Sequence, residues 1–518
     1  MAGQTIEKTR EVRNGTLRLI VAAIAIVIEL VIVAVFAQYF SEQAKWLAVL
    51  TRVIAAFTIL VIYNTDVTAS LKVPWITIIM VAPAVGVALC LLVGENGIVK
   101  GMRKDFQKVE AKLFPLLDND PEASKVLSAV DKRAANISHY ITQSSSYPLY
   151  DGTAVTYHPD ATAGIEAQKD AMRTAQDFIF MEYHAIEDAE SWHEVQEILE
   201  ERAAAGVEVR VFYDDMGSIG FITTDFIGRL RERGIKAKVF NPMGGLLNVI
   251  FNNRDHRKIT VVDGKVGFTG GYNIANEYFN ITHPFGHWKD TGVRLEGPAV
   301  RNLTVAFLEM WNAGGDPYSN DDDFARWLPV VAPSLNAQGF VQPYADLPID
   351  DKRVGEDVYI SVVEAAQDYA WFVTPYLIIT DEMIHAMGLA AQRGVDVRII
   401  TPGIPDKKLV YSITRSYYHS LIRNGVRIYE YSPGFCHCKM SVIDDVLATC
   451  GTINLDYRSL YHHFENGCMY CDCDAVADTK ADFEWMFAQS REVTETYSNP
   501  AAGRYLHHLV LRFLAALL

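Results

Sequence analysis

The residues of this chain that could do chemistry form one pattern that is written twice. The pattern is His-x-Lys-x4-Asp, and its two copies are His256, Lys258 and Asp263, and His437, Lys439 and Asp444. Each copy continues to a glycine and an asparagine at matching offsets, which are Gly270 and Asn273, and Gly451 and Asn454. Identities at fixed offsets in two distant segments predict two homologous halves.

The two motifs suit chemistry on a phosphodiester. Residues two apart in a strand share a face, so each motif presents an imidazole and an ammonium group on the same side. Two such faces brought together would gather two imidazoles, two ammonium groups and two carboxamides. The lysines and asparagines can stabilise charge on the phosphate oxygens, while one histidine attacks phosphorus and the other moves the proton. This scheme requires neither a metal nor a cofactor.

The doubled motif resembles the signature of the phospholipase D superfamily, and the whole chain is similar to bacterial cardiolipin synthases of that superfamily. The segments that carry the resemblance are EYHAIEDAESW (182–192), HRKITVVDGKVGFTGGYNIANEY (256–278), WKDTGVRLEGPAVRNLTVAFLEMW (288–311), TPYLIITDEMI (374–384), IYEYSPGFCHCKMSVIDD (428–445) and GTINLDYRSLYHHFENG (451–467). The resemblance implies transfer of a phosphatidyl group from one phosphatidylglycerol to another through a phosphatidyl-histidine, which yields cardiolipin and glycerol.

The resemblance also implies roles for the motif residues. His256 becomes the nucleophile and His437 the general acid and base, although the residue types alone do not rank the two histidines. The phosphate ligands become Lys258, Lys439, Asn273 and Asn454.

Four carboxylates are expected to support these groups. Asp263 and Asp444 should brace the site by hydrogen bonding, at a distance from the phosphate. Glu465, in the segment FENG, is expected at the substrate site beside the second-half histidine. Asp290 is the candidate partner of the first-half histidine, with a different offset from its motif.

The elements around the motifs predict an α/β fold. Strand, helix and strand follow one another at 177–184, 189–205 and 207–213, and again at 369–374, 381–393 and 395–401. Both helices stop at a glycine, Gly206 or Gly394, which is typical of a helix C-terminus. Alternating strands and helices indicate mixed sheets flanked by helices. We therefore expect two halves, 114–335 and 336–518, related by a pseudo-two-fold axis.

The first 113 residues are expected to form a membrane anchor. Apolar stretches run over 19–40, 46–63 and 74–93, and about 20 apolar residues cross a bilayer. The second stretch is short and contains Arg52, so two or three spans remain open. Pro83 should kink the third. The lysines and arginines that follow the spans favour a bacterial cell-membrane protein whose catalytic part faces the cytoplasm.

Composition limits the alternatives. A net charge of −16 disfavours a nucleic-acid partner, and the sequence leaves the oligomeric state open. The cysteines near the second motif, Cys436, Cys438, Cys468, Cys471 and Cys473, could bind zinc, but strand alternation favours core packing for Cys436 and Cys438. A phospholipase-D-type hydrolase, a transferase with another acceptor alcohol and a non-enzymatic membrane protein are the other functions considered. The tail Leu506–Leu518 should form a helix with an apolar face, and both docking on the domain and insertion into lipid remain open.

Overall fold

A computed structural model of the chain describes residues 45–93, 97–117, 121–242, 253–313 and 323–499, together with Val35, Asp321, Arg512, Phe513 and Ala515. The chain divides into two compact units. The larger unit comprises Arg103–Asn241 and Asn253–Arg504, and it contains both motifs. The other unit comprises Met1–Met102, Pro242–Asn252 and Tyr505–Leu518.

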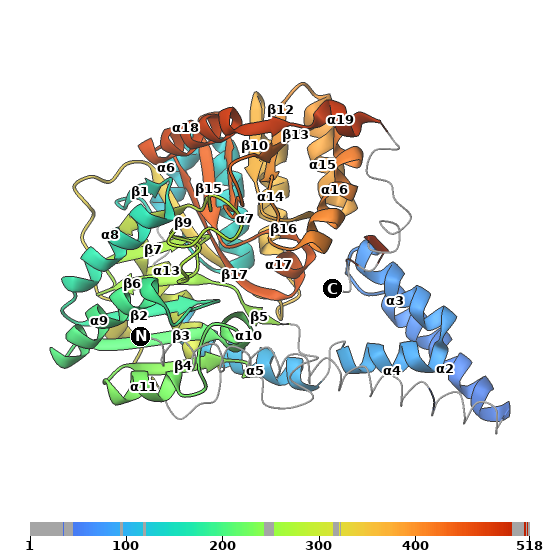
Figure 1. The fold of residues 1–518 in the computed structure, drawn as a ribbon, viewed down its shortest axis with the longest axis horizontal. Helices are drawn as coiled ribbons and strands as arrows, with labels where there is room; N and C mark the ends of the chain where they lie inside the picture. Colours follow the sequence, from blue (N-terminus) through green and yellow to red (C-terminus); the bar gives the residue numbers. More distant parts are fainter. Residues whose placement is uncertain are drawn as a thin grey trace. The chain divides into compact units, whose positions relative to one another are not determined.

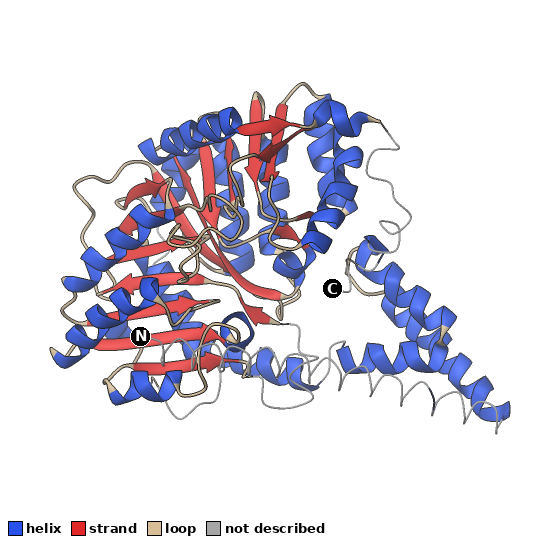
Figure 2. Ribbon diagram, viewed as in Figure 1, coloured by secondary structure: helices blue, strands red, loops and turns tan. Residues whose placement is uncertain are grey.

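The larger unit contains two large mixed sheets flanked by helices (Figures 1 and 2). The first sheet has seven strands, in the order β1 (Ala154–His158), β8 (Gly292–Glu296), β7 (Val266–Gly270), β6 (Lys258–Val262), β2 (Phe178–Tyr183), β3 (Glu208–Asp214) and β4 (Lys236–Phe240). Its helices are α8 (Ala161–Arg173), α9 (Glu190–Ala204), α10 (Asp215–Ser218), α11 (Phe226–Glu232) and α13 (Val300–Asn312).

The second sheet has nine strands. Their path runs through β18 (Ser490–Glu492), β13 (Arg427–Tyr431), β12 (Asp396–Pro402), β10 (Tyr369–Val373), β14 (Met440–Ile443), β15 (Leu447–Gly451), β17 (His463–Cys471) and β5 (Arg254–Asp255), and β9 (Phe340–Asp346) also pairs with β17. A two-stranded sheet joins β11 (Leu377–Ile378) to β16 (Leu455–Asp456). The helices of this half are α14 (Val354–Ala365), α15 (Asp381–Gln392), α16 (Lys408–Ile422), α17 (Tyr457–Tyr461), α18 (Asp474–Gln489) and α19 (Thr494–Ser498).

The two sheets repeat one topology. Strands β6, β7 and β8 form an antiparallel meander beside β2, and β2, β3 and β4 run parallel. Strands β14, β15 and β17 likewise form an antiparallel meander beside β10, and β10, β12 and β13 run parallel. The expected strand–helix–strand units are present within one or two residues, and Gly206 and Gly394 follow their helices with positive φ values of 93° and 101°. The α/β prediction with two repeated halves is thus confirmed.

The helix α13 lies between the halves, because it packs on β2, β6 and β7 of the first sheet and on β9 of the second. Twelve of its residues are buried, which explains why its sequence VRNLTVAFLEMW is largely apolar. Four further elements precede β1 or connect the sheets: α6 (Pro121–Val130), α7 (Lys132–Ser145), η1 (Phe114–Leu116) and η2 (Ala325–Trp327). The first half thus shares its core with the second half.

The N-terminal helices differ from the expected spans. They are α2 (Lys45–Tyr63), α3 (Ala69–Val81), α4 (Pro83–Val93) and α5 (Gly97–Leu113). The stretch 74–93 breaks at Ala82, because Pro83 has no N–H to donate and its ring disturbs the preceding turn. Within the described ranges, the structure contains no helix with the length and apolarity needed to span a membrane. The expected span 19–40 and the tail 506–518 lie almost wholly outside those ranges.

Candidate active site

The two motif histidines lie where the halves exchange backbone hydrogen bonds. The short strand β5 pairs in parallel with the start of β17, and the His256 N–H donates to the Phe464 carbonyl at 2.9 Å. In the other half, Lys289 and Cys436 form an isolated parallel β-bridge. The His437 N–H donates to the Lys289 carbonyl at 2.8 Å. Each histidine is therefore positioned by a segment of the opposite half.

This exchange gives each histidine a carboxylate from the other half. His256 Nδ1 lies 3.0 Å from Glu465 Oε2, and His437 Nδ1 lies 2.7 Å from Asp290 Oδ2. Our expectation that each carboxylate supports the histidine of its own half is wrong, since the pairs are crossed. The physical reason is the backbone ladder between the halves, which sets Glu465 beside His256 and Asp290 beside His437.

The sheet register shows that the two carboxylates are equivalent despite their different offsets. Gly270 pairs with Gly292 across β7 and β8, and Gly451 pairs with Gly467 across β15 and β17. Asp290 and Glu465 each lie two residues before the second glycine of their pair. The motif glycines permit this close pairing, because a Cβ at Gly270 would lie 2.6 Å from Gly292 Cα.

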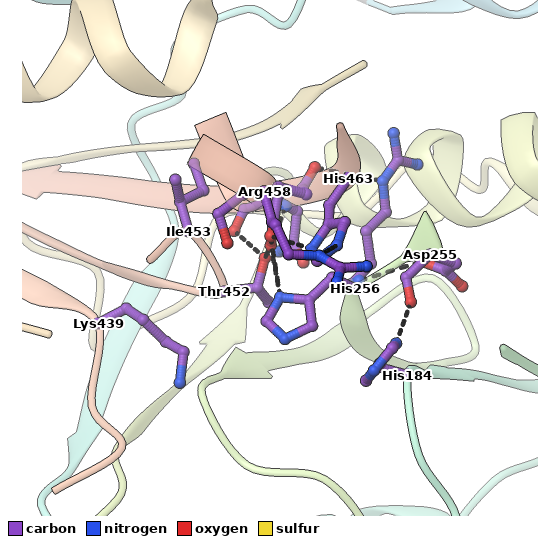
Figure 3. A network of polar contacts seen from close by, with 12 residues as sticks. His184, Asp255, His256, Lys439, Thr452, Ile453, Arg458 and His463 are labelled. Carbon is purple, nitrogen blue, oxygen red and sulfur yellow. Dashed lines mark hydrogen bonds and ion pairs between the residues drawn. The ribbon is translucent and has the colours of Figure 1, made fainter. Parts of the chain in front are cut away.

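The lysines lie with the histidines, although His256 precedes β6 and both His437 and Lys439 precede β14. Lys258 Nζ donates to the His256 carbonyl at 2.6 Å, and Lys439 Nζ donates to the His437 carbonyl. Burial lowers the pKa of Lys258 to about 7, and the charge of Lys439 lowers it further, whereas Glu465 opposes this. Burial also lowers the pKa of Lys439. The two motifs therefore form one electrostatic cluster, and Figure 3 shows Lys439 extending beside His256.

Burial controls the protonation of the two histidine–carboxylate pairs, which we call dyads: His256 with Glu465, and His437 with Asp290. It lowers the pKa of His256 well below the usual range, and the charge of Lys258 lowers it further. The same causes, burial and then Lys439, lower the pKa of His437. Burial raises the pKa of Asp290 to about 7 and raises that of Glu465. Both imidazoles are thus neutral at pH 7. Because Nδ1 of each faces a carboxylate, Nε2 is the nitrogen left for the substrate.

The motif aspartates lie at the far ends of their strands, away from the histidines. Asp263 accepts hydrogen bonds from the backbone N–H groups of Gln176, Asp177 and Phe178 at 2.8–2.9 Å. Asp444 accepts three equivalent bonds from Gln367, Asp368 and Tyr369 at 2.8–2.9 Å. Both aspartates occupy hairpin turns with positive φ, 53° and 50°. Each fixes the adjacent strand and touches no reacting group, as a bracing role requires.

The two asparagines are buried close to the motifs. Asn273 accepts from the Ala185 N–H at 3.1 Å and donates to the Tyr278 hydroxyl at 2.8 Å. The Tyr278 ring lies 5.3 Å from the His437 ring, so Asn273 of the first half lies near the second-half histidine. Asn454 Oδ1 is buried without a hydrogen-bond partner, which leaves it available to a ligand.

The surroundings of the two histidines differ. Aromatic rings surround His437: Tyr278, Trp288 and Phe435 lie with their centroids 5.3–5.8 Å away. His256 instead lies between two other imidazoles, His184 at 4.9 Å and His463 at 5.3 Å. Sequence analysis missed both. The pair His462–His463 directly before FENG was the available signal.

Beneath His256 lies a charged layer that the second half lacks. Arg257 donates to the Glu465 carbonyl at 3.2 Å, to the Ala306 carbonyl at 2.9 Å and to Glu309 Oε2 at 3.2 Å. The equivalent position in the second motif is Cys438, which is fully buried. Arg257 thus ties α13 to the strand that carries Glu465.

Among the described residues, one group has ligand atoms close enough together to hold a metal ion. It consists of His256, His463 and Glu465. The cations of Lys258 and Lys439 close by disfavour a metal dication there. All cysteines are free, and Cys436 and Cys438 are buried in the core, as strand alternation predicts. Burial raises the pKa of Cys438, so this thiol is protonated and is a poor zinc ligand.

Known proteins resemble the chain over most of its length. The family described as "Cardiolipin synthase, PLD-like domain" matches residues 169–311 and 359–487. A protein of Streptococcus mutans called uncharacterised is 40% identical over 462 residues, 89% of this chain and 99% of the relative. Cardiolipin synthase 2 of Bacillus anthracis is 31% identical over 456 residues, 85% of each chain. A crystal structure of phosphatidylserine synthase from Haemophilus influenzae shares the fold, with a TM-score of 0.55 and 14% identity over 74% of this chain and 97% of that chain.

The two matched segments each contain one complete motif, and each supplies the carboxylate that supports the other segment's histidine. The chain therefore belongs to the cardiolipin synthase family with phospholipase-D-like domains.

Proposed function

We propose that this protein is a cardiolipin synthase that transfers a phosphatidyl group from one phosphatidylglycerol to another. The observation that carries the proposal is the pair of crossed dyads, His256 with Glu465 and His437 with Asp290. Together with Lys258 and Lys439 they form one buried cluster, which suits a single phosphodiester.

In the first step, His256 Nε2 attacks phosphorus and forms an N–P bond. The bond between phosphorus and the glycerol oxygen breaks, and His437 protonates the departing oxygen. Because the pKa of Asp290 is raised to about 7, the Asp290–His437 pair holds a dissociable proton near neutral pH. The anionic phosphate favours that proton on the imidazole. Lys258 and Lys439 stabilise charge on the non-bridging oxygens.

In the second step, His437 removes the proton from the primary hydroxyl of a second phosphatidylglycerol. The hydroxyl oxygen attacks phosphorus, the N–P bond breaks, and neutral His256 is restored. The aromatic rings of Tyr278, Trp288 and Phe435 limit the polarity around His437, which disfavours bulk water as the acceptor.

Residues 1–113 hold the enzyme at a membrane in this proposal. Large apolar side chains are exposed along α2, including Trp46, Val53 and Phe57, each more than 60% exposed. Such a surface requires an apolar partner, which lipid supplies. The number of spans and the cytoplasmic orientation remain predictions. Recovery of the protein in the membrane fraction after alkaline carbonate washing would support the anchor, and release into the wash would refute it.

The decisive experiment supplies the purified full-length protein with phosphatidylglycerol in mixed micelles and measures lipid products and free glycerol. We expect cardiolipin and glycerol in equal amounts, and added glycerol should drive the reaction backwards. Phosphatidic acid as the main product would instead identify a hydrolase. Transfer to a different alcohol alone would retain the chemistry and change the substrate.

A further inference from the structure

His463 lies beside the carboxylate that supports the proposed nucleophile, but it has no part in the chemistry described above. Its Nδ1 lies 3.5 Å from Glu465 Oε1, and the same oxygen lies 2.9 Å from His256 Nδ1. One oxygen of Glu465 is therefore close to two imidazoles, whose ring centroids are 5.3 Å apart. Figure 3 shows both rings in the polar network, together with Arg458.

Arg458 fixes the tautomer of His463. Its Nε donates to His463 Nε2 at 3.3 Å. A guanidinium nitrogen can only donate, so His463 Nε2 must accept. Burial lowers the pKa of His463 well below the usual range, and the charge of Arg458 lowers it further, so the ring is neutral at pH 7. A neutral ring whose Nε2 accepts carries its single proton on Nδ1, which is the nitrogen near Glu465.

The proton on His463 Nδ1 needs an acceptor. Among the residues that the structure describes, this buried nitrogen has no hydrogen-bond partner. A buried donor without an acceptor is unfavourable, and such groups are rare in folded proteins. Glu465 Oε1, at 3.5 Å, needs to approach by only about 0.5 Å to reach an ordinary hydrogen-bond distance. The donor of His463 therefore matches the carboxylate of Glu465.

The other dyad has a different residue at the equivalent position. Trp288 lies two residues before Asp290, as His463 lies two residues before Glu465. Both rings lie beside the catalytic histidine of the opposite half, with 5.4 Å and 5.3 Å between ring centroids. Within the described ranges, however, the indole N–H of Trp288 forms no hydrogen bond. Asp290 thus lacks the donor that His463 presents to Glu465.

This difference suits the two steps assigned to the histidines. When His256 Nε2 forms the N–P bond, the ring keeps its proton on Nδ1 and gains a positive charge. Glu465 must therefore remain an ionised acceptor, and a second N–H donor both stabilises a carboxylate and fixes its orientation. His437 instead gains and loses a proton in each cycle, and a carboxylate that shares that proton assists it.

We propose that His463 is a positioning residue, which donates from Nδ1 to Glu465 and holds this carboxylate against His256 Nδ1. The inference rests on the proposed function, because it takes His256 as the nucleophile. His463 contacts no reacting atom in this scheme. Its loss should therefore slow the chemical step and leave the binding of phosphatidylglycerol unchanged.

The test replaces the two ring nitrogens of His463 one at a time in the full-length enzyme. The amide nitrogen of asparagine can take the place of Nδ1, and the amide oxygen of glutamine can take the place of Nε2. His463→Asn retains the donor to Glu465, so it should form the phosphatidyl-histidine at close to the wild-type rate. His463→Gln retains only the acceptor for Arg458 and should slow this step about tenfold or more, as expected when a hydrogen bond to a charged group is lost. His463→Phe, which lacks both nitrogens, should be slowed to a similar extent.

The rate is measured in a rapid-quench single turnover over a range of phosphatidylglycerol concentrations. The half-saturating concentration should not change in any variant. The same three substitutions at His462, the neighbouring residue outside β17, are the matched controls and should alter neither quantity. In the unsubstituted protein, ¹⁵N NMR should find the proton of His463 on Nδ1, which tests the tautomer even where a variant fails to fold.

Equal slowing by His463→Asn and His463→Gln would overturn the proposal, because the ring would then serve packing alone. A wild-type rate in His463→Phe, or a proton on Nε2 of His463, would also overturn it. A higher half-saturating concentration with an unchanged rate would assign His463 to substrate binding instead. Failure of the proposed function is distinct: the wild type would then carry its adduct on His437, or form the adduct on His256 without making cardiolipin.

Discussion

Replacing Glu465 with glutamine should disable His256, the histidine of the other half. The carboxylate lies 3.0 Å from His256 Nδ1 and also accepts a hydrogen bond from the Thr452 hydroxyl. In Glu465→Gln the amide oxygen can still accept from Thr452. The amide NH2 then takes the place of the other carboxylate oxygen, 2.9 Å from Nδ1, and favours the tautomer in which Nδ1 accepts and the ring proton lies on Nε2. His256 therefore loses the lone pair with which it attacks phosphorus.

The structure sets the size of this effect. A buried hydrogen bond to a charged group contributes about 1.5–3 kcal/mol, which corresponds to a roughly 10- to 150-fold slower step. Reversing the tautomer adds to this, and an equivalent acid-to-amide change in a serine protease triad costs about 10⁴-fold. We therefore expect formation of the phosphatidyl-histidine to slow by about 10² to 10⁴. Asp290→Asn should instead slow the proton transfers of His437.

The assay is a rapid-quench single turnover with mass spectrometry of the histidine adduct. Glu465→Gln should form the adduct slowly, so little is ever present. Asp290→Asn should slow both the formation and the release of the adduct, because His437 protonates the departing glycerol and later deprotonates the acceptor. Circular dichroism and thermal unfolding of both variants control for folding. If Glu465→Gln accumulates the adduct, or if Asp290→Asn leaves both its formation and its release at the wild-type rate, the crossed assignment of roles is refuted.

Three further predictions concern the two motif histidines, the motif aspartate Asp263 and the buried Asp346 at the end of β9. His256→Ala and His437→Ala should each lower turnover by several orders of magnitude, and a double variant far worse than either would show that the two do not act as one unit. Asp263→Asn should lower the unfolding free energy by about 2 kcal/mol, because three backbone N–H groups share its carboxylate; an unchanged denaturation midpoint would contradict this. Burial raises the pKa of Asp346 to about 7 from roughly 3.9 when unfolded, so the folded state retains a proton that the unfolded state loses, and stability should fall as the pH rises through this window. Asp346→Asn should flatten that dependence in urea titrations at pH 4 and 7, and an unaltered slope would exclude Asp346 as its source.

Much of the chemistry could be predicted from the sequence, because it depends on local periodicity. Residues two apart in extended backbone share a face, which predicts that His256 and Lys258 point the same way, and that His437 and Lys439 do so too. The repeated motif implied two halves with one topology. The strand–helix–strand units could be predicted from their apolar pattern and from the glycine that follows each helix. Pro83 likewise indicated the break between α3 and α4, because proline acts on the adjacent turn.

The partners of the histidines could not be predicted from the sequence, because they depend on contacts between distant segments. Offsets along the chain suggested that each carboxylate supports its own half, whereas the pairing of β5 with β17 places Glu465 beside His256. The lowered pKa values of the histidines and lysines come from burial, which exists only once the two halves pack together. Sequence thus determined which groups are present, and tertiary packing decided which group each one acts on.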